Sequence, residues 1–592
     1  MTTLNDAQQA HKEGRLDDAE ALYQALLAAE PTNADACTLF GVMLGAKGRF
    51  DEGVRWIDKG LALDPDAGLF HFQKGTVLMA AQRLGEAIAS FERALELSPN
   101  APSFHFNYAN ALRANEDWLP AIAHYKKAIQ LQPDFLEAYN NIALSLVHEK
   151  LYDDARGYAE KAVALNPSYG DGWLTLCNVA EKLKDYKTAL DAGAKAVVLI
   201  PDNHYAWFGY GVALNRMNRD ANAVEAYKRS LTLNPKRADI WDNLAQTYQA
   251  LNQLDEAEKA FRKTVEVAGQ AFDEKDGPDV DESLYGDRHW HLALMQLLRG
   301  NYREGFARYR ARGKAIPELK RRAMPVPLWK GEPLNGKTLF VHDEQGFGDT
   351  LMLARFLPLI KQQGATVVFS VHKALESFFA GWPVVDTLIT HEENVPACDF
   401  FCSSFDLPHR LKTTLETLPN ALPYLPLPLV EPSCRLPETQ GLRIGVVWGG
   451  SPLHRADRKR SIPLGLFEDL LTLPDVTFYS LNRDKKPGDD VLLPRLPVCD
   501  LAPRLDSFAT SAQFVSQMDL LITCDTATAH LAGGMGKEVW IMLPFAPDWR
   551  WMIDRTDTPW YPTTRLFRQP KPEDWQTVLT NVKTALKEKI SR

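Results

Sequence analysis

Residues 31–64, PTNADACTLFGVMLGAKGRFDEGVRWIDKGLALD, and residues 65–98, PDAGLFHFQKGTVLMAAQRLGEAIASFERALELS, are two versions of one 34-residue pattern. Each version begins with a proline. The same step separates all of the prolines in this series: Pro31, Pro65, Pro99, Pro133, Pro167, Pro201 and Pro235. Because proline cannot continue a helix, it marks the point where each unit ends. A fixed period of this length predicts a stack of helix pairs, each of which buries its apolar face against its neighbours.

Two sets of small residues recur at the same step, one on each expected helix of a pair. The first set is Ala7, Gly41, Gly75, Ala109, Ala143, Cys177, Gly211 and Ala245, and the second is Ala19, Gly53, Ala87, Ala121, Ala155, Ala189, Ala223 and Ala257. An aromatic residue often stands four residues after the second set, as in Tyr23, Phe91, Tyr125, Tyr227 and Phe261. Small side chains let two antiparallel helices approach closely, and the aromatic ring fills the space beside them.

The period is that of the tetratricopeptide repeat, and we expect an α-solenoid with a right-handed superhelix. Residues 1–268 hold about eight repeats, and residues 269–335 hold degenerate repeat-like helices and a linker. A ninth, degenerate repeat is expected over 286–310. The curved inner face of such a solenoid binds extended peptides or proteins, and it could also form a homodimer.

Three asparagines share one register position on the first helices of their repeats, namely Asn107, Asn141 and Asn243. An asparagine there could hydrogen-bond the backbone of a bound protein acceptor. The alternative is that they are solvated or capping residues of their own helices. Trp173, Trp207 and Trp241 also share a register position, and we interpret them as packing residues.

The second half of the chain alternates expected strands and helices, which predicts parallel sheets covered by helices. We expect an α/β region of two Rossmann-like lobes, 336–430 and 431–592, with a ligand cleft between them. The expected strands are 338–342, 366–371, 443–448, 476–481, 520–523 and 539–543.

The composition excludes several classes of function. The chain has 592 residues and a net charge of −9, which disfavours binding to nucleic acid or to an anionic membrane. Its seven cysteines contain no CxxC pair, so neither a zinc site nor a disulfide framework is indicated. No signal-peptide pattern and no long apolar run is present, and we expect a cytoplasmic protein without membrane insertion.

Three loops of the second half carry candidate chemistry. The first is QGFGDT, residues 345–350, between an expected strand and a helix. Its glycines, Gly346 and Gly348, let the backbone turn tightly near a ligand, and Asp349 at the helix start could act as a general base. A plain helix N-cap is the alternative role for Asp349.

The second loop joins small residues to clustered cations. It contains Trp448, Gly449, Gly450, Ser451, Arg455, Arg458, Lys459, Arg460 and Ser461. Small residues at a strand end, followed by cations, favour a phosphate-binding loop. A solvated basic loop or a patch for nucleic acid is the alternative.

The third loop is CDTATAHLAG, residues 524–533. Asp525 or Thr526 can cap the helix that begins there, and the N–H groups of Thr526 and Ala527 then favour an anion. A lone histidine such as His530 is more often structural than catalytic.

Together these three loops resemble the GT-B glycosyltransferases of family 9, the heptosyltransferase type. The resemblance implies that Gly348-Asp349 supplies the catalytic base and that Arg460, in RSIP, contacts the donor phosphate. It also implies that Asp525, Thr526 and His530 hold the donor. Residues 543–569, LPFAPDWRWMIDRTDTPWYPTTRLFRQ, look like a hallmark of members linked to tetratricopeptide repeats.

Two departures leave the nucleotide and the sugar open. The family's basic phosphate contact is often lysine, where this chain has Arg460. The acidic residue expected near the ribose is not evident, and the chain has Asn482-Arg483-Asp484 there.

The architecture as a whole resembles bacterial protein O-glycosyltransferases that modify flagellin with nonulosonic acids. It is also similar in plan to the eukaryotic enzyme that adds N-acetylglucosamine to proteins, although the motifs differ. The flagellin resemblance implies a CMP-linked donor, such as pseudaminic or legionaminic acid, and Ser or Thr acceptors.

The implied reaction is a single displacement with inversion that uses the nucleotide-sugar as co-substrate, with no cofactor and no metal. Two DxD sequences are present, Asp64-Pro65-Asp66 and Asp279-Val280-Asp281, but neither follows a strand of the second half. Two other functions stay open: a repeat scaffold with an inactive transferase region, and a glycosyltransferase that acts on lipopolysaccharide.

Overall fold

The computed structural model describes residues 3–269, 286, 288–315, 324–452 and 457–591. The chain divides into two compact units, Met1–Pro235 and Lys236–Arg592. Among the residues that the structure describes, no helix is both long enough and apolar enough to cross a membrane.

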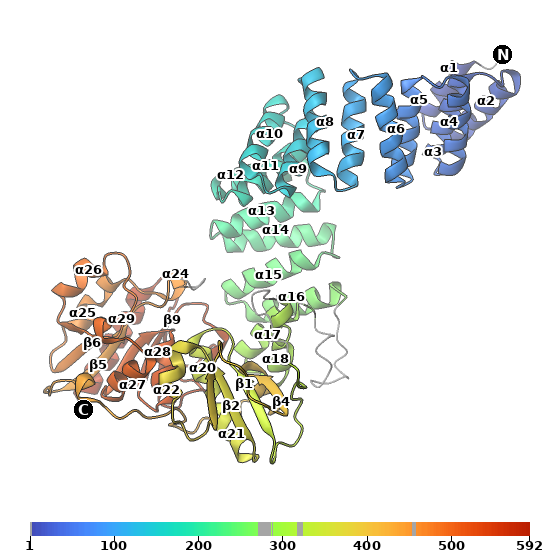
Figure 1. The fold of residues 1–592 in the computed structure, drawn as a ribbon. Coiled ribbons are helices and arrows are strands. Elements are labelled where there is room, and N and C mark those ends of the chain that lie inside the picture. The colour runs from blue at the N-terminus through green and yellow to red at the C-terminus, as the bar shows by residue number, and fades with distance from the viewer. Residues whose placement is uncertain (1–2, 270–285, 287, 316–323, 453–456, 592) are drawn as a thin grey trace. The chain divides into compact units, whose positions relative to one another are not determined.

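The first unit is built from antiparallel helix pairs, as the 34-residue period predicts (Figure 1). Its helices are α1 (Leu4–Lys12), α2 (Leu16–Ala29), α3 (Ala34–Ala46), α4 (Phe50–Leu63), α5 (Gly68–Ala80), α6 (Leu84–Leu97), α7 (Pro102–Ala114), α8 (Trp118–Leu131), α9 (Leu136–His148), α10 (Tyr152–Leu165), α11 (Gly170–Lys182), α12 (Tyr186–Leu199), α13 (His204–Arg216) and α14 (Asp220–Leu233). Helices α15 (Ala238–Ala250) and α16 (Leu254–Val267) form the eighth pair, in the second unit.

The expected packing of small residues against aromatic rings is confirmed. A Cβ on Gly75 would lie 2.7 Å from the ring of Phe91, and one on Gly211 would lie 2.6 Å from the ring of Tyr227. The backbones of the paired helices therefore approach as closely as these positions allow, and the ring occupies the remaining space.

Two further contacts recur with the period. A ring nitrogen or hydroxyl six residues after each proline bonds that proline's carbonyl in five successive repeats, from His71 (3.0 Å), His105 (2.9 Å), Tyr139 (3.2 Å), Trp173 (2.8 Å) and Trp207 (2.7 Å). The turn inside each repeat contains a residue with positive φ: Gly14, Gly48, Gln82, Glu116, Lys150, Lys184, Asn218 and Asn252. Trp173 and Trp207, which were interpreted as packing residues, thus also bond the turn between repeats.

The second unit continues with α17 (His289–Leu298), α18 (Tyr302–Tyr309) and α19 (Arg312–Ala315), followed by two parallel sheets. The first lobe has the strand order β3-β2-β1-β4. Its strands are β1 (Thr338–His342), β2 (Thr366–Val371), β3 (Thr387–Thr390) and β4 (Phe400–Ser403), and its α-helices are α20 (Phe347–Leu353), α21 (Leu357–Gln362), α22 (Lys373–Phe379) and α23 (Leu407–Arg410). A 3₁₀ turn at Ala354–Phe356 separates α20 from α21.

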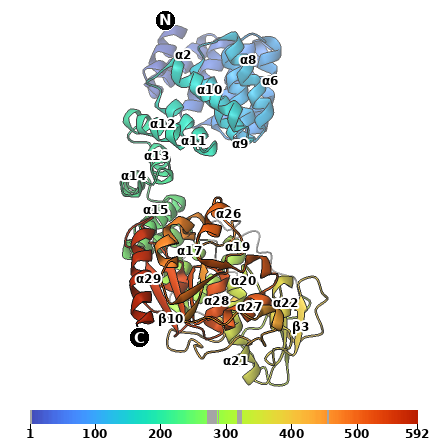
Figure 2. The same cartoon turned by 90° about the vertical axis from the view of Figure 1, so that its left-hand side faces the viewer.

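The second lobe has the order β10-β9-β8-β5-β6-β7. Its strands are β5 (Leu442–Val447), β6 (Val476–Ser480), β7 (Val498–Asp500), β8 (Leu520–Cys524), β9 (Val539–Leu543) and β10 (Thr564–Arg568). Its α-helices are α24 (Asp457–Arg460), α25 (Glu468–Leu471), α26 (Asp489–Leu492), α27 (Phe508–Ser516), α28 (Ala527–Gly534) and α29 (Trp575–Ile590). Helix α29 lies beside β10 (Figure 2).

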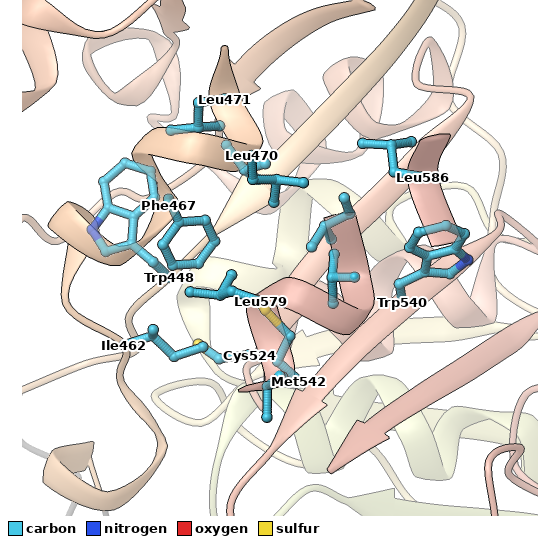
Figure 3. Packing of buried hydrophobic residues seen from close by; sticks show 14 of the residues in the cluster. Trp448, Ile462, Phe467, Leu470, Leu471, Cys524, Trp540, Met542, Leu579 and Leu586 are labelled. Atoms are coloured by element: carbon cyan, nitrogen blue, oxygen red, sulfur yellow. The ribbon is translucent and has the colours of Figure 1, made fainter. Parts of the chain in front are cut away.

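The core of the second lobe explains why its central strands β8 and β9 are fully buried and largely apolar. Side chains from β5, β8 and β9 pack with Phe467, Leu470 and Leu471 and with the inner face of α29, including Leu579 and Leu586 (Figure 3). A parallel sheet buried in this way needs apolar residues along nearly every strand position. The polar residues are therefore left to the loops at the strand ends.

Candidate functional site at the seam between the two lobes

The loop after β1 places Asp349 in the first turn of α20, as predicted. Gly346 is the N-cap residue, and its N–H donates to Asp349 Oδ2 at 3.1 Å. Asp349 is therefore not the N-cap residue itself; it stands at the third helical position, and its side chain accepts the N–H of the N-cap residue. The other carboxylate oxygen, Oδ1, forms an ion pair with Arg550 from the loop after β9.

Gly348 lies where α20 of the first lobe meets α28 of the second. A Cβ at this position would lie 2.7 Å from His530 Cδ2 and 3.4 Å from Ala527 Cα. Gly348 was predicted to belong to a ligand-binding loop. Its lack of a side chain also lets α20 and α28 pack in direct contact. We call this contact, together with the loops after β1, β5, β6, β8 and β9, the seam.

Arg550 was not singled out from the sequence, yet it joins three of the seam's groups. Besides Asp349, its guanidinium pairs with Asp548 at 2.6 Å and lies 4.5 Å from the centre of the Trp549 ring. Burial alone would lower the pKa of Arg550, but Asp349 and Asp548 raise it well above its ordinary value. The group is therefore a fixed cation, and its position after β9 was the feature that could have revealed it.

The loop after β5 is cationic where it faces the loop after β8. Arg460 Nη1 donates to the carbonyl of Asp525 at 2.9 Å, and a Cβ on Gly450 would lie 2.7 Å from Arg460 Nη2. Lys486, also missed from the sequence, donates to the Gly450 carbonyl at 2.7 Å and pairs with Asp457. Two cations thus flank the small residues of this loop.

The remaining residues of this loop have structural contacts. The N–H of Gly449 donates to Asn482 Oδ1 at 2.8 Å, and Ser461 Oγ accepts from Gly450 N–H at 3.3 Å. Trp448 points into the core, and its indole donates to Asp489 at 2.8 Å (Figure 3). Trp448 is therefore a poor candidate for a donor contact. Arg455 and the side chain of Arg458 lie outside the described residues.

The loop after β8 begins α28, with Thr526 as its N-cap residue. The Thr526 hydroxyl lies 3.1 Å from that of Thr523 and does not cap the helix, which leaves the first N–H groups of α28 without this partner. Burial and the nearby Asp548 carboxylate raise the pKa of Asp525 to about 6, against the opposing effects of Arg550 and Arg460. Asp525 is thus a carboxyl in a crowded, poorly solvated place.

His530 makes structural contacts in this setting, and its role in holding a donor stays a prediction. Its Nδ1 lies 2.8 Å from the Tyr561 hydroxyl, and its ring stacks on Trp551 with centroids 5.2 Å apart. Burial, followed by Arg550, Arg355 and Arg460, lowers its pKa well below the ordinary value. The ring is therefore neutral near pH 7, and its place is between the lobes, against Gly348.

A further polar cluster supports α20 from the first lobe. Asp343 is buried, accepts from the Thr350 hydroxyl at 3.0 Å and from the His372 N–H at 3.2 Å, and pairs with His391. These residues follow the carboxyl ends of β1, β2 and β3. The seam thus brings together the following residues that were predicted from the sequence: Gly348, Asp349, Arg460, Asp525, Thr526 and His530. Arg550, Asp548 and Lys486 also lie there, although the sequence analysis did not select them.

The asparagines of the repeats make local contacts. Asn107 Nδ2 donates to the Ser103 carbonyl at 2.9 Å, and Asn243 Nδ2 donates to the Asp239 carbonyl at 2.8 Å, each within its own helix. Asn141 Nδ2 donates to Asn110 Oδ1 at 3.0 Å. The bonds of Asn107 and Asn243 favour the interpretation as helix residues, whereas Asn141 joins its helix to α7 of the preceding repeat; acceptor binding stays a prediction for all three. Of the two DxD sequences, Asp279-Val280-Asp281 lies outside the described residues.

Comparisons with known proteins agree with the repeat half. Tetratricopeptide repeat models match residues 41–102, 72–134, 106–170 and 174–238, and two further tetratricopeptide models match 10–71 and 226–259. The chain is 27% identical over 337 residues to Protein FlbA of Caulobacter vibrioides, a match that covers 50% of this chain and 55% of that protein. The chain thus spans about half the length of the curated relative that it matches.

Solved structures of repeat proteins are also similar over part of the chain. YrrB, described as a TPR protein with an unusual peptide-binding site, is 26% identical, and the match covers 30% of this chain and 92% of YrrB with a TM-score of 0.27. PilF of Pseudomonas aeruginosa is 18% identical, and the match covers 36% of this chain and 97% of PilF with a TM-score of 0.33. The N-terminal half is therefore a tetratricopeptide solenoid, on the strength of the matching repeat models and the helix pairs.

Proposed function

We propose that the protein is an inverting, metal-independent GT-B glycosyltransferase that transfers a sugar from a nucleotide-sugar to Ser or Thr of a protein held by the repeats. Flagellin is the candidate acceptor, and a CMP-linked nonulosonic acid is the candidate donor. One observation carries the proposal: a carboxylate from the first lobe and cations from the second meet at the carboxyl ends of two parallel sheets. Such ends are where α/β proteins hold ligands.

The seam supplies groups for each part of this reaction. The acceptor hydroxyl gives its proton to Asp349, and its oxygen forms a bond to the anomeric carbon as the bond from that carbon to the phosphate oxygen breaks. Arg460 and the N–H groups at the start of α28 stabilise the charge on the leaving phosphate. An arriving phosphate would compete with Asp349 for Arg550, which would release the carboxylate to act as a base.

The experiment is thermal stabilisation of the full chain by CMP, UDP, GDP and ADP. A ligand L that binds only the folded state stabilises it by RT ln(1 + L/Kd), so the melting temperature rises with the affinity and, logarithmically, with the concentration of the ligand. We expect one nucleotide to stabilise the protein and Arg460→Gln to remove that effect. Lys459→Gln is the matched control, because it changes the same charge at the neighbouring, exposed position. No shift with any nucleotide would contradict the proposal.

A scaffold protein with an inactive transferase region is the second candidate. One observation favours it: both oxygens of Asp349 already have partners, Gly346 N–H and Arg550. Such a protein would bind its partner through the repeats and show no transfer with any donor. Transfer to a protein or to lipopolysaccharide, compared side by side with the donor that the nucleotide panel selects, separates the remaining alternatives.

A further inference from the structure

The last helix pair, α17–α18, keeps the packing rule of the repeats but gives its aromatic residue new neighbours. Gly305 and Tyr309 are four residues apart, as are Ala19 and Tyr23, and Ala223 and Tyr227. A Cβ on Gly305 would lie 2.7 Å from the side chain of Leu297 on the preceding helix, so this pair is also closely packed. Tyr309 is thus the equivalent of the tyrosine that fills the space inside an ordinary repeat.

Tyr309 contacts the loop that carries Asp349. Its side chain is fully buried, and its ring stacks on Phe405 with centroids 5.0 Å apart. Its hydroxyl lies 3.3 Å from Gln345 Oε1 and 3.2 Å from Gln345 Nε2. Gln345 has a φ of 65° and directly precedes Gly346, the residue whose N–H holds Asp349. A residue other than glycine whose backbone adopts this left-handed conformation needs support from its surroundings.

Arg312, just beyond α18, holds the residue before Gln345. Its Nε and Nη2 donate to the two oxygens of Glu344 at 2.7 and 3.1 Å, and Nη2 also pairs with Asp406 at 2.9 Å. Burial alone would lower the pKa of Arg312, but Asp406 and Glu344 raise it well above the ordinary value. A bidentate pair of this kind fixes geometry as well as charge.

Helix α18 also contacts the residue beside Arg550, which is the ion-pair partner of Asp349 in the second lobe. The centroid of the Trp549 ring lies 5.8 Å from that of Phe306, at an interplanar angle of 88°, and 6.0 Å from that of Tyr309. The guanidinium of Arg550 lies 4.5 Å from the centroid of the same Trp549 ring. One short helix therefore contacts the segments on both sides of the Asp349–Arg550 ion pair.

We propose that the last repeat has become part of the reaction centre, with Tyr309 and Arg312 as positioning residues for Asp349 and Arg550. The role in catalysis rests on the proposed function, whereas the support of the 344–349 loop does not. The equivalent tyrosines of the solenoid have other surroundings, and the hydroxyl of Tyr125 donates to Asn110 Oδ1 at 2.6 Å within the stack of repeats. Tyr23, for example, has a hydroxyl without a hydrogen-bond partner among the described residues.

The test compares Tyr309→Phe with Tyr23→Phe in the full chain by hydrogen exchange. Loss of one hydroxyl bond, about 1 kcal/mol, should speed exchange in peptides over 343–351 roughly fivefold. Tyr23→Phe should leave these peptides and its own repeat unchanged. Arg312→Lys, which keeps the charge but loses the paired geometry, should act in the same direction as Tyr309→Phe. Equal exchange over 343–351 in Tyr309→Phe and wild type would overturn the proposal.

Transfer from CMP-pseudaminic acid to flagellin gives a second measurement. We expect Tyr309→Phe to lower kcat about tenfold while KM for the donor changes less than about twofold, because misplacement of a reacting group costs rate more than binding. If the wild type shows no transfer, the proposed function fails while the exchange result still decides the positioning role. Transfer at the wild-type rate in a variant with faster exchange would overturn the catalytic part.

Discussion

The solenoid and the seam use the same kinds of residue in opposite ways. In the solenoid, a glycine, a proline or an aromatic ring has one role that returns every 34 residues, as the Gly75–Phe91 and Gly211–Tyr227 contacts show. At the seam each contact occurs once and joins segments far apart in the sequence, such as Asp349 and Arg550. A change in the solenoid should therefore have a small, local effect, whereas a change at the seam should affect the whole set of contacts between the two lobes.

The largest expected effect is that of Asp349→Asn at the seam. Asparagine can still accept the Gly346 N–H, so the start of α20 should stay folded. If Asp349 is the base, transfer should fall by about 10²–10⁴-fold. The measurements are the transfer rate and nucleotide stabilisation, and the latter should persist. Full transfer by the folded variant would exclude Asp349 as the base.

The next effect compares one change in both regions, glycine to alanine. In Gly348→Ala the new methyl meets His530, which is fixed by Tyr561 and Trp551, and we expect a loss of about 1–3 kcal/mol. In Gly75→Ala the methyl meets Phe91 at the same 2.7 Å. Here alanine stands at the equivalent position of other repeats and favours the helix, so the loss should be below about 1 kcal/mol.

Urea unfolding measures both variants. A loss in Gly75→Ala as large as in Gly348→Ala would show that the solenoid adapts no better than the seam. It would then remove the contrast between the two regions.

This contrast also explains how much could be predicted from the sequence. Periodic prolines and small residues predicted the helix pairs, and apolar runs predicted strands such as 338–342 and 539–543, because these features depend on near neighbours. Asp349, Arg460 and Asp525 could be selected because they follow strands, and the structure places them at one seam. Arg550 also follows a strand, β9, and could have been selected on that ground, whereas the importance of Lys486 is shown only by its contacts with Gly450 and Asp457. The role of Trp448 was misjudged, since only packing shows that it points into the core.

A third prediction concerns pH. Asp525 has a pKa of about 6 in the folded protein, above the value of 3.8 for the free side chain. The folded state therefore binds the Asp525 proton more tightly than the unfolded state does. The stability that this protonation contributes is present below about pH 4 and is lost as the pH rises through about 6. We expect Asp525→Asn to be more stable than wild type by about 1–2 kcal/mol at about pH 7.5, and by much less at about pH 4.5.

Urea unfolding at the two pH values checks this prediction, with Asp484→Asn as a control from an exposed loop. A gain that is the same at both pH values would contradict the assigned cause. Because the solenoid contains no equivalent crowded carboxyl among the groups with a resolved shift, the pH effect should be confined to the unfolding of the second unit.

The smallest expected effect is a gain in the solenoid from Lys184→Gly. Lys184 is exposed and has a φ of 61° in the turn between α11 and α12, the position that glycine occupies as Gly14 and Gly48. Relief of the left-handed conformation is worth about 1–2 kcal/mol, and the greater freedom of glycine in the unfolded chain offsets about 0.5–1 kcal/mol of it. The net gain should be about 0.5 kcal/mol.

Gly48→Lys, the reverse change at the equivalent turn, should lose about as much. Urea unfolding of the two variants should then give changes of opposite sign and similar size. Since the period makes the two turns interchangeable, a double variant should match the wild type, and a double variant that does not would show that the repeats differ where the sequence predicts them to be alike.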